Sequence, residues 1–317
     1  MRHKAAVPQP TDVNAGALAV LDWPVPAGAP TRGTVLLVHS LGEHMGRYFD
    51  MARQLNGWGF AVRGFDQYGH GASPGIRGGL PDDNRLLDDL VAVIDDTRAH
   101  MDDRMPLILL GHSVGGLLAA RLVSLKLRRV DALVLASPAL SVKLNALQAM
   151  LVNGLYRFAP QARMGHGREP SYLSHDPQSV EDYRCDPLVH DRVSLRLAHF
   201  ITSAGPAVMA QARQWSVPTL LLYAGQNSLV GISGSAAFAR AAPRRVVNAQ
   251  VFPMHYHDLF HELDNAPVFD ALRTWLCQRF VARTLDGSRA GPAALGRRSW
   301  QPDAAIPRMA MGLTPAV

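Results

Sequence analysis

Short runs of apolar residues recur along the chain, separated by turns and by segments with a different apolar period. Such a run favours a strand buried on both faces, as in a parallel sheet, because neither face of that strand meets water. The runs predict strands over residues 17–25, 34–40, 61–67, 106–111, 131–139, 217–225 and 245–253. The first of these, "ALAVLDWPV", is expected to be an edge strand.

Between these runs, apolar residues recur at intervals of three and four, which is typical of a helix with one buried face. This period predicts helices near residues 47–57, 83–100, 114–125, 233–242 and 266–281. Strands that alternate with helices indicate the α/β class, with a mainly parallel central sheet and helices on both of its faces.

The alternation stops between residues 140 and 215, where no clear strand is predicted. Helix-like patterns at 144–159 and 191–204 flank a polar, proline- and histidine-rich middle, so a helical cap or lid is expected here. The predicted core therefore comprises residues 1–139 and 216–282. Residues 283–317 lack any period and are expected to form a flexible C-terminal tail.

Composition narrows the class further. The chain has 317 residues, 48% of them hydrophobic, so a large core is expected. Its net charge of +6 is spread over scattered Lys and Arg residues without a nucleic-acid motif, so no nucleic acid is expected as a partner. Cys185 and Cys277 give neither a disulfide framework nor a metal-binding pair. With no signal-peptide pattern and no span of 18 apolar residues, we predict a soluble cytoplasmic protein.

One serine stands where a predicted strand gives way to a predicted helix, in Gly111-His112-Ser113-Val114-Gly115. This is the G-x-S-x-G pattern of a nucleophile turn, in which the glycines leave room for neighbouring backbone. The Val114 N–H, at the start of the helix, would point towards a developing oxyanion. The alternative is an ordinary glycine-rich turn in which Ser113 caps the helix.

Six motifs together resemble the monoacylglycerol lipase and lysophospholipase branch of the α/β-hydrolase fold. They are "VHSLGEHMGRY" (38–48), "FDQYGHGASPGIRG" (65–78), "GHSVGG" (111–116), "ASPAL" (136–140), "DPLVH" (186–190) and "HDLFHE" (257–262). The resemblance implies an α/β-hydrolase fold with a cap, and an oxyanion hole made by the Leu41 and Val114 N–H groups. The first motif has Ser40 where the family has glycine.

A base is expected late in the chain, after the last strand, and three histidines compete there. His257 is the choice, because His257, Asp258 and Glu262 match the family's pattern of one histidine and two acids. His255, His257 and His261 could instead suggest a metal site. No ligand cluster elsewhere supports one, so no metal is expected.

The expected acid is missing from the loop after residues 217–225. Alignment on the following Leu-Val pair and helix places Asn227 at the acid position, whereas strict spacing from Gly225 places Ser228 there. No Asp or Glu occurs between Trp215 and His257. Three explanations stay open: a deliberate inactivating substitution, a natural site that works with Asn, or a fold retained for binding. An amide lacks the charge that stabilises the imidazolium.

The predicted reaction is hydrolysis of a carboxylic ester with a hydrophobic acyl chain, through an acyl-enzyme on Ser113 and without a cofactor. The family implies monoacylglycerols or lysophospholipids as small-molecule substrates. Other hypotheses are hydrolysis of polyester oligomers, an amidase or peptidase, and a non-catalytic ligand-binding homologue. The apolar residues of the cap indicate the acyl site, and transient contact of the cap with a membrane surface is an additional hypothesis. The sequence does not determine the oligomeric state.

Overall fold

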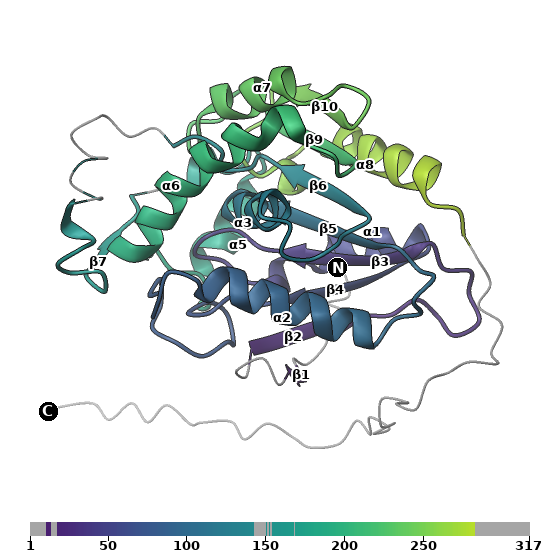
Figure 1. The fold of residues 1–317 in the computed structure, drawn as a ribbon, viewed down its shortest axis with the longest axis horizontal. Coiled ribbons are helices and arrows are strands. Elements are labelled where there is room, and N and C mark those ends of the chain that lie inside the picture. The colour runs from purple at the N-terminus through teal and green to yellow at the C-terminus, as the bar shows by residue number, and fades with distance from the viewer. Residues whose placement is uncertain are drawn as a thin grey trace, which may run out of the picture. The chain divides into compact units, whose positions relative to one another are not determined.

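The central feature is an eight-stranded sheet, drawn in Figure 1. The computed structural model describes residues 11–13, 18–142, 150, 152, 154–167 and 169–282, so the predicted tail at 283–317 lies outside the described residues. The strand order is β1-β2-β4-β3-β5-β6-β9-β10. The strands are β1 (Thr11–Val13), β2 (Leu18–Trp23), β3 (Gly33–Val38), β4 (Phe60–Phe65), β5 (Leu107–His112), β6 (Ala132–Ala136), β9 (Thr219–Ala224) and β10 (Val247–Phe252).

The prediction of a mainly parallel sheet is confirmed. β4, β3, β5, β6, β9 and β10 are parallel neighbours, whereas β1 and β2 pair antiparallel at one side. The expectation that the first predicted strand is an edge strand is wrong, because β1 pairs outside β2 and takes that position. Three residues with one apolar side chain carry too little pattern for β1 to be recognised in the sequence.

Side chains of each inner strand alternate between two apolar layers. On β3, Leu36 and Val38 join one core cluster, while Val35 and Leu37 join the other. All four are almost completely buried, and each such side chain contributes roughly 1.5–3 kcal/mol. This is why the sequence shows an unbroken apolar run at this strand.

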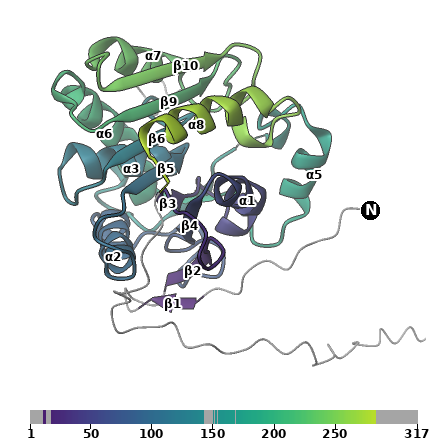
Figure 2. The ribbon, with the colours of Figure 1, turned by 90° about the vertical axis from the view of Figure 1, so that its right-hand side faces the viewer.

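Helices cover both faces of the sheet (Figure 2). Residues of α2 (Arg85–Ala99), α3 (Val114–Ser124) and α7 (Ile232–Ala241) pack in one cluster. Residues of α1 (Phe49–Gly57) and α8 (Ala266–Arg279) pack in the other. These are the five helices that the period of three and four predicts. Short 3-10 helices are η1 (Met45–Tyr48), η2 (Pro170–Tyr172), η3 (Ala212–Gln214) and η4 (Leu259–His261).

The segment between β6 and β9 contains α5 (Pro177–Cys185), α6 (Leu195–Gln211) and a two-stranded sheet. That sheet, of β7 (Arg163–Gly165) and β8 (Arg192–Ser194), corrects the expectation that the segment has no strand. Each strand is only three residues long, so its pairing depends on a tertiary contact rather than on a period. The predicted helix over 191–204 starts later, at Leu195, because the Ser194 hydroxyl caps it. Most of the predicted helix over 144–159 lies at or between undescribed positions.

The register of the sheet brings distant motifs to one edge. Val38 of β3 is paired with Gly111 of β5, and His112 of β5 is paired with Ala136 of β6. The residues that follow β3, β5 and β6 therefore emerge side by side at the carboxyl end of the sheet, where ligands of α/β folds bind.

Candidate active site

Ser113 occupies the turn between β5 and α3 in a conformation that few non-glycine residues adopt. Its φ is 53° and its ψ is −114°, and its side chain is completely buried. The turn is held by backbone hydrogen bonds: Ser113 N–H donates to the Ala136 carbonyl over 2.9 Å, and Ser113 O accepts from Leu117 and Ala139 N–H, each over 3.0 Å. A positive φ strains the backbone of a non-glycine residue, and residues with such strain cluster at functional sites.

The glycines of this turn are required by close backbone contacts. A Cβ on Gly111 would lie 2.4 Å from the Gly115 carbonyl oxygen. A Cβ on Gly115 would lie 2.2 Å from the Val38 oxygen and 2.4 Å from the His39 oxygen. The first turn of α3 therefore packs directly against the loop that follows β3, and the two segments form one wall of the site.

His257 contacts the serine through one ring nitrogen and Asn227 through the other. His257 Nε2 lies 2.8 Å from Ser113 Oγ. His257 Nδ1 lies 2.9 Å from Asn227 Nδ2 and 3.2 Å from Asn227 Oδ1. Asn227 is 4% exposed, whereas Ser228 is exposed, so the structure brings Asn227 rather than Ser228 to the histidine.

Two backbone groups determine how the Asn227 amide is oriented. Its Oδ1 accepts hydrogen bonds from Leu229 N–H and Val230 N–H, each over 3.1 Å. Turning the amide over would place its NH₂ against two N–H donors, so Nδ2 is the atom left to face His257 Nδ1. Because Nδ2 only donates, Nδ1 accepts, and the ring carries its proton on Nε2. That tautomer donates to Ser113 Oγ instead of accepting its proton.

Leu41 and Val114 each present a backbone N–H that has no acceptor within the part of the chain that the structure describes. Both residues are buried, with exposed fractions of 4% and 2%. A buried N–H without an acceptor is rare in native proteins and calls for an explanation. Two such donors beside a serine turn can together bind an oxyanion.

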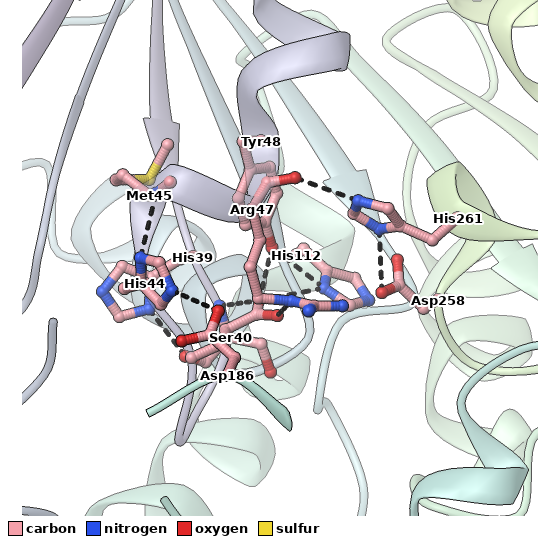
Figure 3. Close-up of polar contacts among 12 residues, drawn as sticks. His39, Ser40, His44, Met45, Arg47, Tyr48, His112, Asp186, Asp258 and His261 are labelled. Carbon is pink, nitrogen blue, oxygen red and sulfur yellow. Dashed lines mark hydrogen bonds and ion pairs between the residues drawn. The ribbon is translucent and has the colours of Figure 1, made fainter. Parts of the chain in front are cut away.

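A buried polar network holds the loop after β3, and Figure 3 labels Tyr48 and His112 among its members. The Glu43 carboxylate accepts Ser40 N–H over 2.8 Å and the Tyr48 hydroxyl over 2.6 Å. His112 lies between this carboxylate and the backbone of His257, 3.6 Å from Glu43 Oε1 and 3.4 Å from His257 O. Of these residues, His112 could be located from the sequence, because it directly precedes Ser113 in the serine motif.

Charges in this network compensate one another. Burial opposes ionisation of Glu43, yet hydrogen bonding and charge attraction from His112, with Arg47, hold its pKa well below the usual range. Burial likewise lowers the pKa of His112, but the Glu43 hydrogen bond and the charges of Asp258 and Glu43 produce a net rise. Each group therefore favours the charged form of the other, and the contacts of His112 connect the loop after β3 to the His257 backbone.

Side chains of two residues of this loop, His44 and Arg47, contact the segment between β6 and β9. His44 Nε2 lies 2.8 Å from the Asp186 carboxylate. The Arg47 guanidinium lies over the Tyr183 ring, 5.0 Å from its centroid. Arg47 also approaches Glu43, with 3.5 Å between Nε and Oε2. The loop that carries Leu41 is thus held from both sides, by the core and by α5 with the residue after it.

The other two histidines that follow the last strand, His255 and His261, contact different groups. His255 Nε2 contacts the Asp264 carbonyl over 2.8 Å, and His261 Nδ1 contacts the Asp258 carboxylate over 2.9 Å. No group of three or more His, Cys, Asp or Glu residues is arranged to hold a metal ion among the residues that the structure describes.

The strand order, the strained serine turn and the histidine after the last strand define an α/β-hydrolase. The chain belongs to the family described as serine aminopeptidase, S33, whose model matches residues 29–264. It is 27% identical to a monoacylglycerol lipase of Mycolicibacterium smegmatis over 248 residues, which cover 77% of this chain and 88% of the relative. The resemblance inferred from the six motifs is confirmed.

Two solved structures support the same conclusion. The monoacylglycerol lipase of Paleococcus ferrophilus superimposes with a TM-score of 0.73 at 31% identity, covering 82% of this chain and 98% of that one. A soluble variant of the Saccharomyces cerevisiae monoglyceride lipase, solved with a substrate analog, superimposes with a TM-score of 0.80 at 22% identity, covering 88% and 98%. The second likeness concerns the fold alone.

Proposed function

We propose that this chain is a monoacylglycerol lipase-like carboxylic ester hydrolase in which Ser113 is the nucleophile and His257 the base. The observation that carries the proposal is the 2.8 Å contact between His257 Nε2 and Ser113 Oγ on the strained turn. A nucleophile within hydrogen-bond distance of a base, which a third group orients in turn, is the arrangement that acyl transfer requires.

The reaction runs in two halves. Ser113 Oγ attacks the ester carbonyl while its proton passes to His257 Nε2, and the negative charge on the carbonyl oxygen is bound by the Leu41 and Val114 N–H groups. His257 then gives the proton to the leaving alcohol, and the acyl group stays on Ser113. Water attacks the acyl-enzyme by the same route, releasing a carboxylic acid and restoring the serine. No cofactor takes part.

Asn227 sets the rate in this proposal. The resting tautomer, with its proton on Nε2, must change before His257 can accept from Ser113. The imidazolium then places its Nδ1–H towards an amide whose oxygen, at 3.2 Å, already accepts from Leu229 and Val230. In a serine protease, an Asp-to-Asn change at this position lowers kcat by about 10⁴. We therefore propose a slow hydrolase with a natural Asn rather than an inert fold.

The substrate class rests on the relatives and on the segment over residues 140–215, which we propose as the cap. Monoacylglycerol and lysophospholipid esters carry one long acyl chain, which an apolar cap can enclose. Several large apolar side chains of the cap are exposed: Met150, Leu155, Phe158, Met164 and Tyr172. We propose that they contact a membrane or micelle surface from which the substrate is taken. None of the described helices is long and apolar enough to cross a bilayer.

A non-catalytic binding protein is the second candidate, and the Asn227 Nδ2 contact to His257 favours it. Turnover separates the two. We expect the purified chain to hydrolyse 4-nitrophenyl esters of medium-chain acids faster than a Ser113→Ala variant does, and to leave the matching anilides uncleaved. Faster cleavage of the anilides would favour an amidase or peptidase. Binding of the esters without turnover, in this chain and in Asn227→Asp, would contradict the hydrolase.

A further inference from the structure

The Ser40 hydroxyl is a buried polar group that the mechanism above does not use. Ser40 is 3% exposed, and its Oγ has no hydrogen-bond partner among the described residues. The rest of the residue is satisfied. Its N–H donates to Glu43 Oε1 over 2.8 Å, and its carbonyl lies 2.7 Å from His39 Nδ1. The backbone of Ser40 is thus held firmly while its hydroxyl is left without a partner.

Ser40 belongs to the loop after β3, which packs against the serine turn. Ser40 directly precedes Leu41, whose N–H also lacks an acceptor in the described structure. The preceding residue, His39, has its carbonyl oxygen 2.4 Å from the position of a Cβ on Gly115, so the loop packs against the first turn of α3. Val114, with the third unsatisfied donor, belongs to that same turn. Residues 40, 41 and 114 thus each carry a donor without an acceptor in the described structure, on two segments that pack against each other.

A buried hydroxyl without a hydrogen-bond partner lowers the stability of the folded protein. A buried donor without a partner destabilises a protein by about 1–3 kcal/mol, and the family pattern has a glycine at this position, which would avoid that cost. A ligand oxygen that arrives between Leu41 and Val114 would satisfy the hydroxyl. The ester's carbonyl oxygen does so most strongly when it becomes negatively charged in the tetrahedral intermediate.

We propose that the Ser40 hydroxyl is a third donor of the oxyanion hole, beside the Leu41 and Val114 N–H groups. This inference rests on the proposed hydrolase function. The O–H donates a hydrogen bond to the carbonyl oxygen as it gains charge, and no proton or bond is transferred. The extra donor would stabilise the transition state at the carbonyl oxygen. This would partly offset the weaker stabilisation of the imidazolium by Asn227, which lacks the charge of a carboxylate.

Ser40→Ala and Ser40→Thr test the proposal. Loss of one oxyanion donor costs about 10²–10³ in kcat in other enzymes, and for a third donor we expect a loss of about 10–100-fold in Ser40→Ala with KM within about twofold. Ser40→Thr keeps the hydroxyl and is expected to retain most of the activity. The Tm of Ser40→Ala should stay the same or rise, because the variant removes an unsatisfied polar group. A hydroxyl with a purely structural role would lower Tm instead.

Ser235→Ala is the control, since Ser235 is also a buried serine, 2% exposed, but lies on α7 and outside the loops that carry the site. We expect its kcat to change less than twofold. Both substitutions are also made in Asn227→Asp, where turnover is faster and small losses are easier to measure. Unchanged kcat in Ser40→Ala while Asn227→Asp is active would overturn the third donor and leave the hydrolase intact. Absence of turnover in the parent and in Asn227→Asp would overturn both.

Discussion

The Asn227 amide nitrogen lies 2.9 Å from His257 Nδ1, at the position where a triad carboxylate would accept the ring N–H. The amide cannot reverse without placing its NH₂ against the N–H groups of Leu229 and Val230. One atom therefore separates this site from a complete triad. An oxygen at Nδ2 would keep the contacts of Oδ1 with Leu229 and Val230 and would select the tautomer that accepts the serine proton.

Asn227→Asp is expected to raise kcat/KM for short esters by about 10³–10⁴, because a carboxylate orients the imidazole and stabilises the imidazolium. A fluorophosphonate probe, which labels an activated serine, should react with Ser113 faster by a similar factor. Intact-protein mass spectrometry over a time course measures this labelling directly.

Ser228→Asp is the matched control for this gain. It introduces the same charge one residue later, at an exposed position away from the histidine, so neither labelling nor turnover should increase. Equal gains in the two variants would show that net charge, rather than contact with His257, controls the rate. No gain in Asn227→Asp would argue against His257 as the base.

Gly115→Ala tests the packing of the serine turn. Its new Cβ would meet the carbonyl oxygens of Val38 and His39 at 2.2 and 2.4 Å, and backbone cannot move aside as a flexible side chain can. We expect a loss of about 2–3 kcal/mol in the free energy of unfolding, measured with urea. Gly57→Ala is the control: its Cβ meets nothing within 4 Å, so its stability should be equal or slightly higher. Equal stability of the two variants would contradict this packing.

Asp258 is expected to make stability pH-dependent in acid. Burial raises the pKa of this carboxyl, but the charge and the hydrogen bond of His261 lower it, from the ordinary 3.8 to about 2. A depressed pKa contributes stability, here roughly 2 kcal/mol, that is present above about pH 4 and is lost as the pH falls towards about 2. Asp258→Asn should therefore be less stable at pH 7.

Urea unfolding at a series of pH values measures the effect. Between about pH 4 and 2, the free energy of unfolding should fall less steeply in Asp258→Asn than in the parent. Asp270→Asn, at an exposed position of α8, should keep the parent's slope. The explanation fails if Asp258→Asn and the parent lose stability with the same slope.

Phe158→Ser tests contact of the cap with a lipid surface. Phe158 is 87% exposed, and its substitution should reduce sedimentation with phospholipid vesicles severalfold while hydrolysis of short dissolved esters stays the same. Leu125→Ser, on a 41% exposed leucine at the end of α3, should leave both measurements unchanged. An equal loss of vesicle binding in both variants would indicate non-specific hydrophobic adsorption rather than binding through the cap.

Much of the fold could be predicted because each element carries its own local pattern. Leu107–His112 is an apolar run followed by a helix period, so the strand, the turn and the helix around Ser113 were visible in the sequence. The paired strands β7 and β8 were not, because three residues without a period specify no strand until a partner is adjacent. The same limit hid β1 at the edge of the sheet.

The sequence by itself determined the class of protein, the serine motif, the late histidine and the absence of an acid between Trp215 and His257. These are properties of residue types and their order. Tertiary structure alone decided which atom of Asn227 faces His257 and that the Ser40 hydroxyl has no partner. Both depend on directions of individual donors and acceptors, which exist only after β3, β5 and the loop beyond β9 have come together at one edge of the sheet.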